Sequence, residues 1–381
     1  MKKLLVISLA IVLFIVVGCQ KTPPIEEEKA DSIKIGAALP LTGTVAVWGK
    51  NARNGMELAR KEINEAGGIN GRKLEIIYED TAGVPQTGVS VINKLITIDK
   101  VPAVMGCITS STTLAMAPIA TRNNVVLFSP GASNPKLSEA GPYFFRNFPS
   151  DAIEAPEIAR MAHKELKLER VAILLVNNEF GKGHEIGFRA EFEKLGGTIV
   201  AAESFAQEAS DFRAQIAKIK KANPEGIFVP GYPKEMSTIL RQLLEAGLKA
   251  KIICPSALID NNLIKVAGAV VEGVIFADQR PPDQNSSVVQ HFLKAYRAAY
   301  NEEPGIVADT SYDAVRILAN CIKNGGDSGT AIRDQLTRIK NFPGAAGFTS
   351  FDQNGDVVKT PVFKKVENGK IIGFWDNPPS Q

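Results

Sequence analysis

Small hydroxyl residues gather in two short segments of this sequence. The first is Gly106–Thr112 (GCITSST) and the second is Ser129–Pro135 (SPGASNP). Both follow apolar runs of strand type, and the first leads directly into a helical pattern. Hydroxyl groups and free backbone N–H groups at the start of a helix suit a carboxylate or a similar anion. Helix capping alone is the alternative function of these residues, because Ser and Thr are preferred caps.

The elements around these segments alternate between strands and helices. The predicted strands are 33–39, 74–78, 102–106 and 125–129, and the predicted helices are 51–66, 87–98 and 110–122. We expect Asn51 to cap the first of these helices. The alternation predicts a parallel sheet covered by helices on both faces. In such a sheet both hydroxyl-rich segments emerge at the carboxyl ends of the strands, where open α/β sheets bind ligands.

The alternation restarts after residue 150. Further helices are predicted at 151–166, 184–195, 211–221 and 235–246, and further strands at 170–176, 198–205, 226–230, 251–254 and 273–277. Both halves contain a helix, a Gly-Gly pair and a strand in the same order, as in EINEAGGINGRKLEII and EFEKLGGTIVAAESF. The sequence therefore predicts two similar lobes. Three helices, at 287–300, 308–324 and 330–339, and a hairpin that turns at 353–356 complete the predicted elements.

Signatures of catalysis and of metal binding are absent. The segment GTVAVWGKN (43–51) departs from a phosphate-binding P-loop, because its glycines are too far apart and Asn51 replaces the hydroxyl residue. His163, His184 and His291 lack metal-ligand spacing, and we expect all three to be exposed on helices or at their ends. The sequence predicts no catalytic residue, no metal site and no cofactor.

Composition excludes several classes of partner. Apolar residues make up 45% of the chain and charged residues 22%, which is typical of an ordinary globular protein. A net charge of +3 gives no basic surface for nucleic acid. Cys107, Cys254 and Cys321 lie far apart in the sequence, and we expect them to be buried free thiols.

The first residues match a bacterial lipoprotein signal. Lys2 and Lys3 precede the uncharged apolar run Leu4–Val17, and Val16-Val17-Gly18-Cys19 fits the lipobox pattern. We predict a signal peptide over 1–18, a lipid on Cys19 and a flexible tether over 19–32. The protein would then be held on the periplasmic or extracellular face of a bacterial membrane. An ordinary cleaved signal peptide with a chance Cys is the alternative.

Long stretches of the chain resemble the leucine/isoleucine/valine-binding protein family. The resemblance is carried by IKIGAALPLTGTVAVWGKNARNGMELARKEINEAGGINGRKLEIIYED, GCITSSTTLAMAPIA, LFSPGASNPKL, FRNFPSDA, NNEFGKG, FVPGYPKEMSTILRQLLEAGL, VAGAVVEGVIF and SYDAVRIL. Members of this family are extracytoplasmic solute receptors of ABC importers. The resemblance implies an α/β protein with two similar doubly wound parallel-sheet lobes joined by a three-segment hinge. Lobe one would comprise 33–150 and 280–362, and lobe two 151–279 and 363–381.

The resemblance also implies a ligand site between the lobes. Ser110 matches the serine that holds the ligand's α-carboxylate, and Gly131 and Ser133 match neighbouring polar contacts. Trp48, Tyr232 and Phe180 match aromatic positions, with Phe180 in place of a common Tyr. Including flanking residues, the predicted ligand-binding set is Trp48, Ser110, Ser111, Gly131, Ala132, Ser133, Phe180, Tyr232 and Ser256.

One position departs from the family pattern. Branched-chain amino acid binders place a Glu against the ligand's ammonium group, where this chain has Ser256. A buried ammonium without a carboxylate partner costs several kcal/mol. Either another acid substitutes, or the ligand is a related carboxylate, an amide or an aromatic acid. The implied partners are a small-molecule ligand, an ABC permease with its ATPase subunits, and the membrane through the lipid anchor. The alternative is a ligand-sensing receptor for a separate signalling protein.

Overall fold

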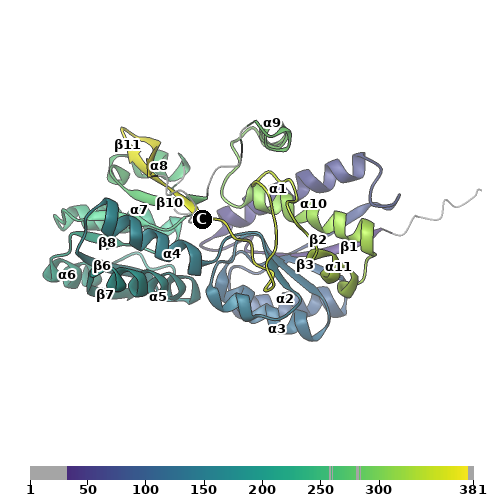
Figure 1. Ribbon diagram of the computed structural model, residues 1–381, viewed down its shortest axis with the longest axis horizontal. Helices are drawn as coiled ribbons and strands as arrows, with labels where there is room; N and C mark the ends of the chain where they lie inside the picture. The colour runs from purple at the N-terminus through teal and green to yellow at the C-terminus, as the bar shows by residue number, and fades with distance from the viewer. Residues whose placement is uncertain (1–31, 257–258, 260, 280–282, 284, 376–381) are drawn as a thin grey trace, which may run out of the picture. The chain divides into compact units, whose positions relative to one another are not determined.

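The computed structural model describes residues 32–256, 259, 261–279, 283 and 285–375. Cys19, the signal peptide and nearly all of the predicted tether lie outside these residues. Within them the chain forms two open sheets, each built on short strands followed by helices (Figure 1). This arrangement agrees with the predicted α/β class.

The first sheet holds five parallel strands in the order β2-β1-β3-β4-β5. Its strands are β1 (Ile33–Leu39), β2 (Leu74–Asp80), β3 (Ala103–Gly106), β4 (Val126–Ser129) and β5 (Phe144–Arg146). The elements between them are α1 (Ala46–Glu65), α2 (Pro85–Thr97), α3 (Ser110–Arg122) and the short 3₁₀-helix η1 (Pro135–Glu139). β5 was not among the predicted strands.

The second sheet repeats this plan. Its parallel strands follow the order β7-β6-β8-β9-β10, which matches the order of the first sheet strand for strand, and β11 and β12 extend it in antiparallel fashion. The strands are β6 (Arg170–Val176), β7 (Thr198–Phe205), β8 (Gly226–Phe228), β9 (Lys251–Cys254), β10 (Ile275–Gln279), β11 (Pro361–Glu367) and β12 (Lys370–Trp375). The matching order explains the internal sequence symmetry.

The helices of the second half of the chain form two groups: those beside the second sheet and those beside the first. The former are α4 (Asp151–Arg160) with its π-helical continuation Met161–Glu165, α5 (Glu179–Lys194), α6 (Arg213–Ala222), α7 (Pro233–Glu245), α8 (Asn261–Ala267) and the 3₁₀-turn Gly268–Val271. The latter are α9 (Ser287–Tyr300), α10 (Ala308–Gly325) and α11 (Gly329–Leu336). α10 packs along α1, although the two helices are far apart in the sequence (Figure 1).

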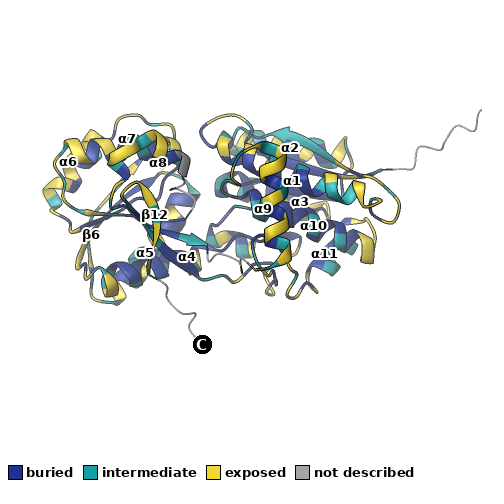
Figure 2. Ribbon diagram, turned by 90° about the horizontal axis from the view of Figure 1, so that it is seen from above, coloured by how far each residue is buried: buried dark blue, intermediate teal, exposed yellow. Residues whose placement is uncertain are grey.

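Alternate strand residues face opposite sides of each sheet and bury both faces. In the first sheet Ala38 and Val104 face α2 and α3, whereas Ala37 and Met105 face α1 and α10. Figure 2 shows the result, with dark blue strands inside and helices whose outer surfaces are yellow. Burial of both faces by helices is what a parallel sheet requires.

Two local predictions were wrong. α1 begins at Ala46, so Asn51 is a buried interior residue of the helix and does not cap it. The early start is possible because Gly49 lets the helix approach β1 closely, where an added Cβ would lie 2.0 Å from the Pro40 carbonyl oxygen. The hairpin predicted at 353–356 is reduced to an isolated bridge between Phe351 and Val357, and the longer hairpin is β11–β12.

Candidate functional site

A cavity lies at the carboxyl ends of both parallel sheets. The first half of the chain contributes α1, the start of α3 and the turns after its strands. The second half contributes α4, α5, the turns of the second sheet and the segment before α10. The lining residues are Trp48, Ile108, Thr109, Ser110, Gly131, Ser133, Phe148, Asp151, Phe180, His184, Tyr232, Ser256, Ile306 and Val307. This is the position at which open α/β sheets bind ligands.

The first sheet supplies the start of α3 to the cavity. Ser110 is the first helical residue and is buried, with Thr109 in the preceding N-cap position. The first backbone N–H groups of a helix have no acceptor within the helix and carry its positive dipole end. The Ser110 hydroxyl accepts a hydrogen bond from the Asn134 N–H at 3.2 Å, which ties the two hydroxyl-rich segments together. A negatively charged group in the cavity would find uncommitted donors here.

The loop after β4 passes close to the cavity because it lacks a side chain at Gly131. A Cβ at this position would lie 2.7 Å from Ile108 Cγ2 and 3.1 Å from Val307 Cγ1. Ser129 shapes the loop, since its hydroxyl donates to the Cys107 carbonyl at 2.6 Å and accepts from the Ala132 N–H at 2.9 Å. The loop therefore presents backbone to the cavity with little room for any larger residue.

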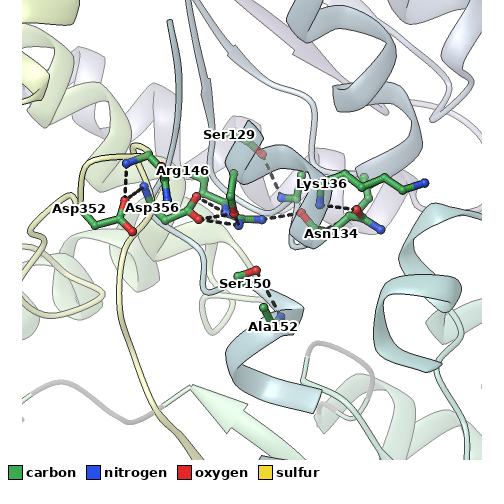
Figure 3. Close-up of polar contacts among 12 residues, drawn as sticks. Ser129, Asn134, Lys136, Arg146, Ser150, Ala152, Asp352 and Asp356 are labelled. Carbon is green, nitrogen blue, oxygen red and sulfur yellow. Dashed lines mark hydrogen bonds and ion pairs between the residues drawn. The ribbon is translucent and has the colours of Figure 1, made fainter. Parts of the chain in front are cut away.

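A buried arginine holds the same loop through a backbone carbonyl group. Arg146 is fully buried, and its Nη1 donates to the Asn134 carbonyl at 2.9 Å (Figure 3). Its Nε and Nη2 donate to the two carboxylate oxygens of Asp356 at 2.7 and 2.9 Å. The Asp352 carboxylate in turn accepts from the Asp356 N–H at 2.9 Å. Bidentate pairing of this kind has a fixed geometry, so it holds the loop in one position.

Aromatic rings form a row along the cavity. Trp48 meets Tyr232 edge to face with ring centroids 5.5 Å apart, and Tyr232 stacks on Phe180 at 5.4 Å. The ring of His184 follows at 4.7 Å from that of Phe180. The Tyr232 hydroxyl accepts a hydrogen bond from Asn178 Nδ2 at 3.0 Å. The Trp48 indole N–H is buried and finds no acceptor among the described residues. The row gives the cavity an apolar side.

Two acids and a histidine are buried together at the second sheet. Asp151 and Glu154 lie one turn apart on α4, and His184 on α5 lies between them. His184 Nδ1 is 3.3 Å from Asp151 Oδ2, and His184 Nε2 is 3.4 Å from Glu154 Oε1. The prediction that His184 is exposed was therefore wrong: it is 1% exposed, because α5 turns the face that carries Phe180 and Phe188 inward. His291 is exposed as predicted, and His163 is partly buried.

Ser256, which stands where the family has a Glu, binds the carboxylate of Glu154. Its backbone N–H donates to Glu154 Oε1 at 2.8 Å, and its hydroxyl donates to Glu154 Oε2 at 2.6 Å. Both oxygens of the Glu154 carboxylate therefore accept a hydrogen bond from Ser256, which follows β9. The acidic residue that lines the cavity is Asp151, the first residue of α4.

Burial and neighbouring groups shift the pKa values of the two acids in opposite directions. Burial raises the pKa of Asp151 to about 6, although His184, Ser133 and Arg146 oppose the rise. For Glu154 the effect of burial is outweighed by His184 and Ser256, which lower its pKa. Burial lowers the pKa of His184, but the two carboxylates reverse this and raise it. The cluster therefore favours the ionised form of Glu154 and the protonated form of His184, so the acids and the imidazole stabilise each other's charges.

Most of the predicted ligand-binding residues meet at this cavity. Those that line it are Trp48, Ser110, Gly131, Ser133, Phe180, Tyr232 and Ser256. Ser111 and Ala132 are outside the lining: the Ser111 hydroxyl accepts from the Glu179 N–H at 3.3 Å, and the Ala132 N–H is held by Ser129. The predicted set did not name Ile108 and Thr109, although both belong to the hydroxyl-rich segment 106–112. Sequence reasoning gave no sign of Phe148, Asp151, His184, Ile306 and Val307.

Other predicted features have clear positions. Cys107, Cys254 and Cys321 are buried free thiols, as predicted. Among the described residues no group of His, Cys, Asp or Glu has an arrangement that could hold a metal ion. The helices in the described part of the chain are all too short or too polar to cross a membrane.

Comparison with known proteins places the chain in a family. A model of periplasmic binding proteins matches residues 32–370. The chain belongs to the periplasmic binding protein family. This family comprises solute-binding proteins, and membership implies an extracytoplasmic location. The fold is that of type I periplasmic binding proteins, so the predicted fold class is confirmed.

Similar proteins bind two kinds of small molecule. The leucine-, isoleucine-, valine-, threonine- and alanine-binding protein of Pseudomonas aeruginosa is 30% identical over 329 residues, which cover 86% of this chain and 88% of that protein. The branched-chain amino acid binding protein LivJ of Streptococcus pneumoniae, solved with isoleucine, is 32% identical with a TM-score of 0.82, over 90% of this chain and 98% of that one. A solute-binding protein of Rhodopseudomonas palustris, solved with 3,4-dihydroxybenzoic acid, is 26% identical with a TM-score of 0.81, over 90% and 96%.

Proposed function

We propose that this protein is the solute-binding component of an ABC importer and binds a branched-chain amino acid or a related small carboxylate in the cavity described above. The observation that carries the proposal is the cavity itself, which unites the N-terminus of α3 with residues from both sheets. The lobes would comprise 33–150 with 280–362, and 151–279 with 363–381. Contacts from the second lobe would stabilise a closed state once ligand has docked on the first.

The proposed binding mode assigns the two sides of the cavity to two ends of the ligand. The α3 N-terminus with Ser110 and Ser133 receives the ligand's carboxylate, since it offers hydroxyls and free N–H donors. Trp48, Phe180 and Tyr232 contact its apolar side chain. Gly131 gives backbone contact, Ser111 and Ala132 support the loops, and Ser256 acts through Glu154.

A ligand screen tests the proposal. Thermal unfolding of purified protein is followed with each of the twenty amino acids, their amides and a set of aromatic acids, and hits are titrated by calorimetry. Binding to the folded state raises the apparent melting temperature by mass action. We expect leucine, isoleucine or valine to bind. The absence of binding by every compound would contradict the proposed function.

An aromatic acid is the second candidate ligand class, favoured by the row of Trp48, Tyr232 and Phe180. A flat ring would pack against this row, and the Rhodopseudomonas palustris protein solved with 3,4-dihydroxybenzoic acid is similar to this chain. Binding of 3,4-dihydroxybenzoate but of no amino acid in the same screen would favour this candidate.

The lipid anchor is part of the proposal and has a separate test. We infer that Cys19 is acylated and tethers the protein beside its permease, on the outer surface of a membrane. Multiple acyl chains give firm anchoring where a single chain does not. The Cys19→Ser variant should lose a metabolically incorporated fatty-acid label and leave the membrane fraction. Cys254→Ser, which alters a buried thiol, is the matched control and should keep the label.

A further inference from the structure

Asp151 is a buried acid that the hydrogen bonds of the fold do not fully satisfy. It is 1% exposed, lines the cavity, and its Oδ2 accepts no hydrogen bond from the described residues. A buried carboxylate oxygen without a donor is costly, so native structures keep one where a ligand, a metal ion or a water completes it. The absence of a metal-binding arrangement among the described residues favours an organic cation or an amine.

The surroundings of Asp151 restrict how a partner can approach. His184 Nδ1 lies 3.3 Å from Oδ2, but this ring nitrogen is also 3.2 Å from the Phe180 carbonyl oxygen. On another side Gly183 leaves the carboxylate room, since a Cβ there would lie 2.7 Å from Oδ2. The Asp151 N–H donates to the Ser133 carbonyl at 2.8 Å, so the residue is fixed beside the loop after β4. The cavity is the remaining side.

Charge balance points to the same conclusion. With both acids ionised, even a protonated His184 balances only one of the two carboxylates, and Asp356 already neutralises the nearby Arg146. Glu154 is committed to Ser256 and His184, which leaves Asp151 to face the ligand. An incoming carboxylate or neutral amide at Asp151 would leave the charge uncompensated, whereas one cationic group would balance it.

We propose that Asp151 determines the ligand class of this site: its Oδ2 receives a cationic amino group of the ligand, and His184 and Glu154 are positioning residues that hold the carboxylate. The inference rests on the proposed function. Ser110 and Asp151 then receive the two charged ends of one zwitterion. Aromatic acids, hydroxy acids and amides bind poorly, because none of them presents a cation to Asp151.

The test compares two ligands that differ only at the amino group. Calorimetry measures the affinity of the wild type and of Asp151→Asn for L-leucine and for L-2-hydroxy-4-methylpentanoate, its hydroxy analogue. We expect the wild type to prefer leucine by about 100-fold. Asp151→Asn should weaken leucine binding by about 100-fold and hydroxy-acid binding by less than about 3-fold, so the preference disappears.

A second variant keeps the test decisive if Asp151→Asn folds poorly. Gly183→Ala retains the acid but places a methyl group against its Oδ2, and it should weaken leucine more than the hydroxy acid. Gly187→Ala, one turn along α5 and facing Ala155, is the matched control and should preserve the preference.

The outcomes separate the inference from the proposed function. Leucine binding that Asp151→Asn leaves unchanged, or equal losses for both ligands, overturns the role of Asp151 while solute binding stands. Tighter wild-type binding of the hydroxy acid overturns it as well. Failure of the wild type to bind any compound of the screen overturns the proposed function, and with it the inference.

Discussion

The two sides of the cavity use different chemistry. On the side of the first sheet, Ser110, Gly131 and Ser133 offer hydroxyls and backbone groups, and the nearby guanidinium of Arg146 is paired with Asp356. On the side of the second sheet, Asp151 and His184 bring buried ionisable groups, with Glu154 beneath them. One side is a set of fixed dipoles, and the other is a cluster of charges.

The difference teaches which side sets affinity and which sets selectivity. Dipoles of a helix N-terminus attract an anion without any change in protonation, so the first side accepts every small carboxylate similarly. Buried charges impose a large penalty on the wrong partner, so the second side discriminates between ligands. A substitution on one side should therefore change either affinity or selectivity, and measuring both shows whether the two sides act independently.

The largest effect is expected from removing the charge of Glu154, which pairs with His184. Glu154→Gln should lower the free energy of unfolding by about 3 kcal/mol, because it breaks a buried ion pair with His184 and weakens two hydrogen bonds from Ser256. Urea unfolding at pH 7.5 measures it. Glu191→Gln on α5, which pairs with the partly exposed Arg160, is the control and should cost less than about 1 kcal/mol. Equal losses would show that the cluster is no more important than a surface pair.

On the first side, Ser110→Ala should weaken binding by about 1–2 kcal/mol through a lost hydrogen bond. Unlike a change at Asp151, it should weaken leucine and its hydroxy analogue to the same extent, because both carry the carboxylate. Titration calorimetry measures both. Ser90→Ala on α2, whose hydroxyl donates to the Gln86 carbonyl within the same helix, is the control and should leave both affinities unchanged. Unchanged affinity would remove Ser110 from the site.

The first side of the cavity could be predicted from the sequence because its signals are local. An apolar strand, a hydroxyl-rich turn and a helical pattern stand in one continuous segment, and α3 begins at Ser110 and ends at Arg122 as predicted. Ser111 was included with its neighbour, but successive helical residues point about 100° apart, so its side chain turns toward α5.

The second side could not be predicted because it is assembled from distant segments. Glu154 and Ser256 meet only when β9 takes its place in the sheet. One signal was available for His184. Phe180, His184, Phe188 and Phe192 recur at spacings of four, which places the histidine on the buried face of a helix. Asp151 gave no such signal, since an acid in the first helical turn is ordinary.

The pH dependence of binding distinguishes the two sides directly. The Asp151 carboxyl has a pKa raised by burial to about 6, so it is ionised above that pH and protonated below it. The groups that face it are His184 from α5, Glu154 from α4, Arg146 from β5 and Ser133. The two carboxylates raise the pKa of His184, and a fall in pH favours its protonated form further, so His184 loses no positive charge as the pH falls. Leucine affinity should fall about 10-fold between pH 7.5 and pH 5, as Asp151 loses its charge.

Calorimetry at four pH values and constant ionic strength measures this fall, and binding near pH 6 should release protons to the buffer. The hydroxy analogue, which meets only the first side, should show no fall. A flat profile for leucine in the wild type would contradict the assignment of charge recognition to the second side.

The smallest effect is expected where the two sheets touch away from the cavity. The Thr44 hydroxyl before α1 donates to Glu208 Oε1 after β7 at 2.6 Å, and Glu208 is exposed. If closure of the two lobes contributes to binding, Thr44→Val should weaken every ligand equally by about 0.5 kcal/mol, because it touches neither side of the cavity. Thr42→Val is a close control, since the Thr42 hydroxyl donates to Asp80 at the same distance within the first half of the chain. A loss that differs between leucine and its hydroxy analogue would mean that selectivity depends on closure as well as on the charges at Asp151.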